Sequence, residues 1–377
     1  MYDLMDFLDP VSMDELTEDN GLTDGQLARN ITFSNAESIE VDAMDIVLVG
    51  APEMRGSGYY KAGGPSAPDM IRKHLYPLHY WHPDVQIGDI GNVRAGDTLT
   101  DSYAAIKTVV AELLRKRKTV VILGGSHDIT LAQYEAYCEL DRTIEATCID
   151  ATIDLRSEST VRSENFLLDM LTNEPSKVKH YNHIGFQSYF VHPRMIETLD
   201  KLRFDCYRAG KIKENIEDME PVIRNSHLVS FDINAIKNSD SPASKQSPNG
   251  LDGIEACMLS RYAGMSTNLD SFGIYGYVPE EDSDELTAMQ IAQMIWYFID
   301  GKNRNKQESS LSEVSNFNEY HTAFAEVDTI FLQSKRSGRW WMQMPGKRFT
   351  ACSYSDYQQA SNNEIPERWL RMQERES

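Results

Sequence analysis

Short apolar runs alternate with longer amphipathic stretches along most of the chain. The apolar runs are rich in β-branched residues and several end at glycine, which predicts buried strands. These strands are expected at Ile46–Gly50, Val85–Ile90, Thr119–Leu123, Thr147–Ile149, His183–Phe186, Leu228–Phe231 and Ser271–Tyr275. Apolar residues at helical spacing predict helices at Asp69–Leu75, Thr100–Lys116, Ile129–Leu140 and Leu286–Ile299.

Strands that are apolar throughout and alternate with helices are typical of a parallel sheet covered on both faces. We therefore predict an α/β protein with three α/β/α layers around a doubly wound, mainly parallel sheet. We assign residues 41–300 to this domain and residues 1–40 to an N-terminal arm, helical or irregular. Residues 301–377 form a predicted C-terminal extension, in which a polar, flexible loop precedes a tail packed on the domain.

The charge and cysteine content of the 377 residues disfavour several classes of protein. With 37 Lys and Arg against 58 Asp and Glu, the formal net charge of -21 opposes binding to nucleic acid or to anionic membranes. No apolar run approaches the roughly 20 residues that a membrane helix needs. The five cysteines are scattered, and the first residues lack the basic and apolar regions of a secretory signal. We therefore expect a cytoplasmic protein.

Three polar segments follow predicted strands and carry the candidate chemistry. They are Gly124–Asp128, Asp150–Arg156 and Ser230–Asn234. In an open α/β sheet, ligands bind at the carboxyl ends of the strands, where such segments converge. His127, Asp150, Asp154 and Asp232 would then form a set of one nitrogen and three carboxylate ligands, which suits Mn²⁺. A cation is also the simplest means of keeping three adjacent carboxylates ionised.

Each of these segments also has a purely structural interpretation. An aspartate at the end of a strand often caps the helix that follows it. A single Gly-Gly-Ser-His stretch is a weak signal, and any one segment is more easily explained by structure than by function. The occurrence of all three, in this order on alternating strands, is much harder to attribute to chance.

The same segments resemble the signatures of the ureohydrolase superfamily, which contains arginases, agmatinases and formimidoylglutamases. That family carries Gly-Gly-x-His, then Asp-Ala-His-x-Asp, then Ser-x-Asp-x-Asp. Upstream, Gly63-Gly64-Pro65 with Ile71-Arg72, and Asp89-Ile90-Gly91, resemble further family motifs. The resemblance implies an arginase-like fold, a homo-oligomer, and two bridged Mn²⁺ ions that activate water against a small amidine or guanidine.

Matched to these signatures, one metal site is complete and the second is not. The first would consist of His127, Asp150, Asp154 and Asp232. In the second, Thr152 stands where the family has a histidine, and Asn234 stands where it has an aspartate. Asn234 can still offer a neutral oxygen, whereas a threonine is a poor ligand for a divalent ion. The resemblance therefore implies one well-formed Mn²⁺ site and a weak or absent second site.

Three further residues bear on the substrate. Asp154-Leu155-Arg156 resembles a motif of formimidoylglutamases, in which Arg156 would bind a substrate carboxylate through its planar guanidinium. Arg156 could instead simply neutralise the acidic cluster. Gln290 is assigned to the position of a family glutamate that binds the guanidinium of arginine in arginase. A neutral side chain there disfavours arginine and agmatine as substrates. The segment Ser163–Leu167 lacks the histidine that serves arginase as a proton shuttle, and Asn165 within it is a further substrate-binding candidate.

The leading hypothesis is a formimidoylglutamase-like hydrolase, which would release formamide and leave glutamate. Asp154, or Asp128 as a second carboxylate, would accept a proton. The main alternative is a catalytically inactive relative that binds a ligand or a partner, which the departures at Thr152, Asn234 and Gln290 favour. Arginase or agmatinase activity is the least consistent with Gln290 and Arg156.

Overall fold

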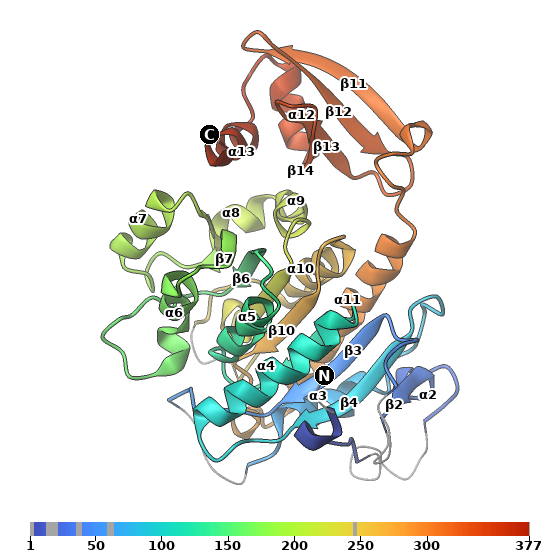
Figure 1. Ribbon diagram of the computed structural model, residues 1–377, viewed down its shortest axis with the longest axis vertical. Coiled ribbons are helices and arrows are strands. Elements are labelled where there is room, and N and C mark those ends of the chain that lie inside the picture. The colour runs from blue at the N-terminus through green and yellow to red at the C-terminus, as the bar shows by residue number, and fades with distance from the viewer. Residues whose placement is uncertain (1–3, 13–21, 35–39, 59–63, 244–246, 377) are drawn as a thin grey trace.

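The apolar runs of the sequence assemble into one large sheet (Figure 1). The computed structural model describes residues 4–12, 22–34, 40–58, 64–243 and 247–376. Within these residues the sheet has ten strands in the order β1-β4-β3-β5-β10-β9-β6-β7-β8, and β2 pairs separately with β4. The strands are β1 (Leu8–Asp9), β2 (Ile31–Phe33), β3 (Ile46–Ala51), β4 (Ile87–Val93), β5 (Thr119–Gly124), β6 (Ile144–Ile149), β7 (Val178–Phe186), β8 (Asp205–Arg208), β9 (Leu228–Asp232) and β10 (Ser271–Tyr275).

Helices cover both faces of this sheet. One face packs against α2 (Leu27–Asn30), α3 (Ala67–Leu75), α8 (Ala209–Glu214), α9 (Glu220–Ile223), α10 (Gly253–Met265) and α11 (Leu286–Lys306). The other packs against α4 (Leu99–Arg115), α5 (Ile129–Glu139), α6 (Phe166–Thr172) and α7 (Pro193–Lys201). Within the described residues, no helix is both long and apolar enough to cross a membrane.

Burial on both faces explains why the central strands are continuously apolar. In β5, Val120 and Ile122 belong to one hydrophobic core, whereas Val121 and Leu123 belong to the other. Successive side chains of a strand point to opposite faces, so both sets must be apolar when both faces are covered. This arrangement confirms the predicted three-layer, doubly wound α/β fold.

The strand order places the candidate site. Strands β5, β10, β9 and β6 are successive neighbours, and their pairings are all parallel. Their carboxyl ends therefore lie along one edge of the sheet. The segments that follow β5, β6 and β9 carry the predicted metal ligands, and these segments are brought together by the pairing alone.

The N-terminal arm contributes strands to the sheet. Strand β1 pairs antiparallel with β4 through Leu8 and Asp9, and β2 pairs parallel with β4. The predicted arm is thus partly integrated into the edge of the sheet in its described residues. Its remaining residues, like Gly63 of the glycine-rich motif, lie outside the part that the structure describes.

The loop that we predicted after residue 300 begins as a helix instead. Helix α11 continues to Lys306. Tertiary contacts explain the difference, because Lys302 Nζ donates to Thr119 Oγ1 at 2.7 Å and Asn305 Nδ2 donates to the carbonyl of Ser266 at 3.0 Å. Polar residues that looked solvated in the sequence are therefore fixed against the sheet and α10.

The rest of the C-terminal extension is a small α/β unit that contacts the domain. Its elements are β11 (Phe317–Phe324), β12 (Val327–Ser334), β13 (Trp340–Gln343), β14 (Phe349–Cys352), α12 (Tyr354–Ser361) and α13 (Glu367–Glu376). The four strands form an antiparallel meander. Phe324, Phe331, Trp340, Met342 and Trp369 belong to a hydrophobic core of this unit. We call residues 307–376 the C-terminal unit.

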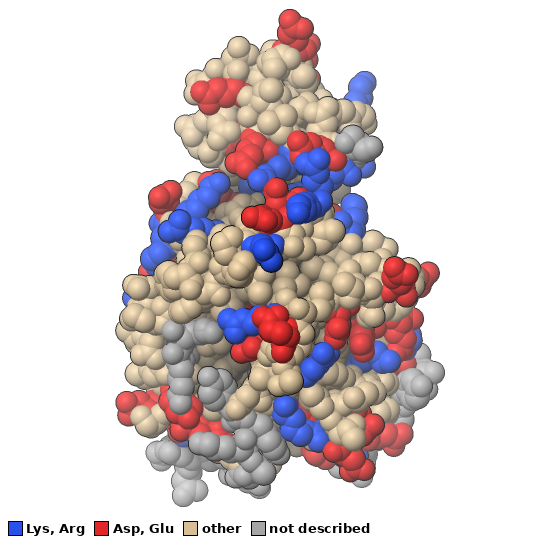
Figure 2. Space-filling model, turned by 90° about the vertical axis from the view of Figure 1, so that its left-hand side faces the viewer, with Lys and Arg blue, Asp and Glu red and all other residues tan. Residues whose placement is uncertain are grey.

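Charged side chains gather where the C-terminal unit meets the larger domain (Figure 2). Arg224 of the domain donates from Nη1 to the carbonyl of Trp340 at 2.8 Å, and its guanidinium lies 4.5 Å from the Trp341 ring centroid. Arg371 of α13 reaches Asp205 of β8 at 2.8 Å. The unit is therefore joined to the domain by directed polar contacts as well as by the chain.

Candidate metal centre

One buried histidine faces three carboxylates at the carboxyl edge of the sheet. His127 follows β5, Asp150 and Asp154 follow β6, and Asp232 is the last residue of β9. His127 Nδ1 lies 3.4 Å from Asp150 Oδ2, 3.1 Å from Asp154 Oδ2 and 3.3 Å from Asp232 Oδ2. The structure thus brings together the four residues that the sequence predicted as the complete site.

The arrangement fits a divalent cation. His127 Nδ1 is buried and has no well-aligned hydrogen-bond partner among the described residues, although three carboxylate oxygens surround it. Ligand atoms about 2.1 Å from an octahedral ion are separated by about 3.0 Å, close to the spacings found here. Ligand atoms of His127, Asp150 and Asp232 all lie within 4.8 Å of one another. Imidazole with carboxylates is a donor set suited to Mn²⁺ and similar ions.

Hydrogen bonds behind the cluster fix the orientation of the ligands. His127 Nε2 shares a hydrogen bond of 3.0 Å with Ser230 Oγ, which is 2.6 Å from Thr130 Oγ1. His183 Nε2 lies 3.1 Å from the carbonyl oxygen of Asp150. Burial lowers the pKa of His183 to about 4, so its ring is neutral and can donate to that carbonyl. Such supporting contacts typically orient metal ligands.

Crowding of the carboxylates changes their protonation. Burial, together with the charge of Asp150, raises the pKa of Asp154 to about 7 and that of Asp232 to about 8. Burial opposes the charged form of His127, but the charge of Asp232 and the close carboxylates of Asp150 and Asp154 outweigh it and raise the His127 pKa. Without a cation the cluster therefore retains protons near neutral pH, and a bound cation would displace them.

Thr152 occupies the space between two of the carboxylates. Its hydroxyl lies 3.0 Å from Asp150 Oδ2 and 3.3 Å from Asp154 Oδ1, and its backbone N–H donates to Asp150 Oδ1 at 3.2 Å. A hydroxyl that donates to carboxylates competes with a cation for the same oxygens. Asn234 donates from its backbone N–H to Asp232 Oδ1 at 2.8 Å, and its side chain lines the adjacent cavity.

A cavity of about 340 Å³ opens over His127 and Asp232. Its lining residues are Met54, Ser57, Ser126, His127, Ser163, Asp232, Asn234, Ala243, Gly276, Val278 and Glu281. Gly276 has φ +83°, and a Cβ there would lie 2.4 Å from Asp232 Oδ1. Gly125 packs against the carbonyl of Glu53, where a Cβ would lie 2.1 Å away. Glycine is required at both positions for the backbone to approach the site.

The structure does not place Asp128 with these residues. Its carboxylate is fully buried, accepts a short hydrogen bond from the Tyr103 hydroxyl and packs on the backbone of Gly56. Burial raises the pKa of Asp128. Because a side chain that follows a strand can turn to either side, adjacency to His127 in the sequence was a poor guide.

The three predicted substrate contacts also lie away from the lining of the cavity. Arg156 is 43% exposed and lies 3.4 Å from Glu164 Oε2. Asn165 Nδ2 donates to the carbonyl of Ser159 at 2.7 Å, which stabilises its own loop. Gln290 Nε2 donates to the carbonyl of Gly253 at 2.9 Å and links α11 to α10. Gln290 is therefore not placed to disfavour a cationic substrate in this cavity.

Several cavity residues were not singled out from the sequence. Ser57 and Met54 come from the segment after β3, Ser163 precedes α6, and Gly276 and Glu281 follow β10. A signal was present in part, because Gly276 directly follows a predicted strand of the same parallel set. The serines carried no such signal, since serine is common in ordinary loops.

The chain thus has a mainly parallel α/β sheet with a histidine and three aspartates at its carboxyl edge. The sequence model of the arginase family matches residues 44–300, and the chain belongs to that family. Curated relatives include the formimidoylglutamase of Lysinibacillus sphaericus, 23% identical over 250 residues (63% of this chain and 77% of the relative). That of Staphylococcus haemolyticus is 24% identical over 289 residues, covering 72% of this chain and 91% of the relative.

Solved structures share the fold. Formiminoglutamase of Trypanosoma cruzi with Mn²⁺ has a TM-score of 0.64 at 18% identity, covering 71% of this chain and 96% of that one. Formimidoylglutamase of Bacillus subtilis has a TM-score of 0.64 at 18% identity, covering 76% and 94%. Agmatine ureohydrolase of Thermoplasma volcanium has a TM-score of 0.59 at 23% identity, covering 71% and 94%.

Proposed function

We propose that this arginase-family protein is a metal-dependent hydrolase of linear amidine C–N bonds, with N-formimidoyl-L-glutamate as its substrate. The observation that carries the proposal is the convergence of three buried carboxylates on His127 Nδ1, at 3.1 to 3.4 Å. Such a cluster is costly without a cation. The names of the relatives support the substrate, since the curated ones quoted above are formimidoylglutamases.

The residues of the chain have distinct proposed roles. His127, Asp150, Asp154 and Asp232 would hold Mn²⁺, which when bound makes water more acidic and more nucleophilic near neutral pH. Asp154 is the proposed proton acceptor, because its carboxylate belongs to the cluster whereas that of Asp128 is turned away. Ser126, Ser163 and Asn234 line the cavity and can donate hydrogen bonds to a substrate.

Metal content tests the site directly. The chain would be stripped with a chelator, reloaded with Mn²⁺, freed of excess ion and assayed by elemental mass spectrometry. We expect about one tightly held Mn²⁺ per chain, because Thr152 binds the carboxylates that a second ion would share. Asp232→Asn should lower this content strongly, whereas Asp328→Asn, on the exposed surface of β12, should not. Absence of metal after loading contradicts the proposal.

Turnover tests the substrate. Formamide release from N-formimidoyl-L-glutamate would be compared with urea release from agmatine and from L-arginine, using the Mn²⁺-loaded chain. We expect the first reaction to be the fastest. Carboxylate binding by Arg156 would require this side chain to leave Glu164, which its 43% exposure permits. Faster urea release would overturn the choice of substrate while leaving metal-dependent hydrolysis intact.

The second candidate function is that of an inactive relative which keeps the fold and binds a ligand or a partner. It is favoured by Thr152, whose hydroxyl stands between two carboxylates, and by Asn234. Metal binding without turnover of any of the three substrates would support this alternative. In either case we propose a cytoplasmic protein, on the composition of the sequence, and a homo-oligomer, as the family resemblance implies.

A further inference from the structure

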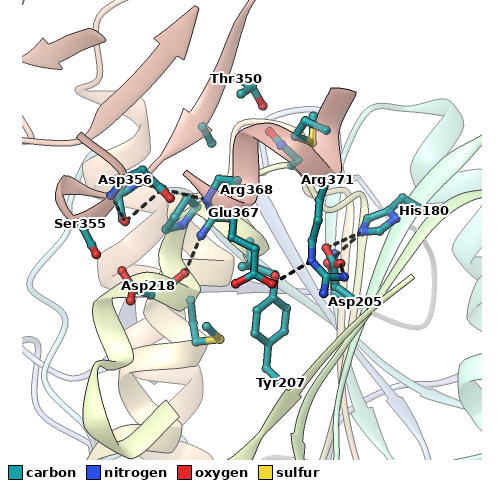
Figure 3. A pocket seen from close by; sticks show the side chains of 18 of the residues that line it. His180, Asp205, Tyr207, Asp218, Thr350, Ser355, Asp356, Glu367, Arg368 and Arg371 are labelled. Atoms are coloured by element: carbon teal, nitrogen blue, oxygen red, sulfur yellow. Dashed lines mark hydrogen bonds and ion pairs between the residues drawn. The ribbon is translucent and has the colours of Figure 1, made fainter. Parts of the chain in front are cut away.

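A second cavity lies between the α/β domain and the C-terminal unit (Figure 3). Its volume is about 220 Å³. The domain contributes residues near the beginning of β6, β7 and β8 and at the end of the short helix Ile216–Met219, and the C-terminal unit contributes β14, α12 and α13. The metal ligands follow the opposite ends of β5, β6 and β9, so this cavity is separate from the metal centre.

Ion pairs hold the two walls of the cavity together. Asp205 Oδ1 accepts from Arg371 Nη1 at 2.8 Å, and Asp205 Oδ2 pairs with Arg375 and lies 3.4 Å from His180 Nε2. Asp356 Oδ2 accepts from Arg368 Nε at 3.0 Å. These contacts account for much of the charge that lines the cavity, and they explain how α13 is fixed over β8.

Two groups in the cavity wall are incompletely satisfied. Asp218 Oδ1 is buried and has no hydrogen-bond partner among the described residues. Arg368 uses Nε toward Asp356 and Nη2 toward the backbone carbonyl of Asp218, at 3.2 Å, while its Nη1 has no partner in the described part of the chain. Buried polar atoms are nearly always paired, so Asp218 Oδ1 calls for an explanation, whereas Arg368, with a side chain 18% exposed, keeps a donor free for a ligand. Figure 3 shows both residues at the cavity, with the hydrogen bond from the Arg368 guanidinium to the backbone carbonyl of Asp218.

We propose that this cavity binds a small zwitterion of the α-amino acid class. Its ammonium would donate to Asp218, and its carboxylate would accept from Arg368. Groups of opposite charge side by side match a ligand that carries both charges, whereas a ligand with a single charge would bind to only one of them. The volume lies below the roughly 300 to 1,000 Å³ typical of sites for drug-sized molecules, which agrees with a ligand of this size.

Binding there would also strengthen the docking of the C-terminal unit. Asp218 belongs to the α/β domain and Arg368 to α13, so a ligand held by both adds a contact across the junction. The ligand therefore binds the docked arrangement better than an undocked one and stabilises it. Neither consequence depends on the hydrolase function proposed above.

Calorimetric titration of the full, Mn²⁺-loaded chain tests the proposal. The probes are glycine, L-serine, L-glutamate and L-arginine, with methylamine and acetate as singly charged comparisons. We expect at least one amino acid to bind roughly tenfold or more tightly than methylamine or acetate, because a hydrogen bond between charged groups contributes on this scale. Asp218→Asn should weaken that binding by a similar factor, and Arg368→Lys, which keeps the charge beside Asp356, should weaken it as well.

Control variants separate this site from other sites and from misfolding. Asp328→Asn removes an exposed carboxylate of β12 and should leave the affinity unchanged. Asp232→Asn alters the metal centre and should leave the affinity for glycine and L-serine unchanged, which distinguishes failure here from failure of the hydrolase proposal. Three outcomes would each overturn the proposal and indicate that the cavity holds only water. They are no binding by any amino acid, equally tight binding of the singly charged probes, and an amino-acid affinity that Asp218→Asn leaves unchanged.

Discussion

At the scale of single residues, the metal centre depends on a histidine whose two nitrogens have different partners. Nδ1 of His127 faces the carboxylates, and Nε2 shares a hydrogen bond with Ser230. The orientation of the ring thus depends on one buried hydroxyl. The metal affinity of the cluster should therefore decrease when that hydroxyl is removed, even though Ser230 is not a proposed ligand.

Ser230→Ala should therefore weaken Mn²⁺ binding by about 10- to 100-fold, the usual effect of losing a contact that orients a ligand. The measurement is a competition titration against a chelator of known affinity. Ser226→Ala is the matched control, because Ser226 is equally buried and bonds to Thr147 at the other end of β9. Equal effects of both changes would mean that general loosening of the sheet, rather than ring orientation, controls the affinity.

Restoring the two positions that depart from the family signatures should create a second metal site. In Thr152→His with Asn234→Asp, the threonine hydroxyl no longer occupies Asp150 and Asp154, and two ligands are added. We expect the Mn²⁺ content to rise from about one to about two ions per chain, measured by elemental mass spectrometry. Unchanged content would indicate that the backbone around these residues no longer supports a bridged pair.

At the scale of elements, α13 is held to the edge of the sheet by Asp205. This carboxylate is buried and pairs with Arg371 and Arg375. Burial opposes its ionisation, but hydrogen bonding to His180 and the charge of Arg375 outweigh it, so the Asp205 pKa lies well below its usual value. A depressed pKa contributes stability above the ordinary aspartate pKa of about 4, and that stability is lost as the pH falls below it.

Asp205→Asn should therefore release α13. We expect a loss of about 2 kcal/mol, less than for a fully buried pair because Arg371 is 41% exposed. Limited proteolysis should then cut the chain near α13 before the α/β domain is degraded. Asp200→Asn is a control on α7, nearby but outside the pair. An unchanged proteolysis pattern would show that the hydrophobic contacts of Trp369 suffice to hold α13.

Elements also differ in how far the sequence predicts them. Strands such as β5 and β10 were predicted because both faces are buried and, after the first residue, every position is apolar or glycine. Helix α10 was missed because it is buried on several sides and lacks a polar stripe. Strand β11 was missed because only its two end residues, Phe317 and Phe324, are buried and it pairs with only one neighbour, so polar residues dominate the positions between them.

At the scale of the whole molecule, the sequence predicted which strand ends carry chemistry but not which side chains turn toward it. His127, Asp150, Asp154 and Asp232 converge because parallel strands fix their positions. Arg156, by contrast, belongs to the same segment as Asp150 and Asp154 but pairs with Glu164, eight residues further along the chain. The sequence positions of the strand ends determine where the four metal ligands lie. The direction of the Arg156 side chain depends instead on long-range packing, which a local sequence pattern does not show.

The protonation of the cluster couples the stability of the whole domain to pH. The pKa values of Asp154 and Asp232 are raised to about 7 and about 8, above the ordinary value near 4. The metal-free folded protein therefore holds more protons than the unfolded chain between about pH 4 and pH 8. Its stability should fall as the pH rises through this range, because ionising these carboxyls places uncompensated charges side by side.

Mn²⁺ should reverse this trend, since it pairs with the carboxylates that proton loss exposes. Thermal unfolding would be measured at pH 6, 7 and 8 with and without Mn²⁺, at constant ionic strength because the chain carries a formal charge of -21. We expect the stabilisation by Mn²⁺ to grow by at least about 1.4 kcal/mol from pH 6 to pH 8, corresponding to a tenfold gain in affinity. Asp154→Asn removes one titrating group and should flatten the dependence. A stabilisation that is the same at all three pH values would mean that the cluster is already ionised without metal, and that its carboxylates are compensated in some other way.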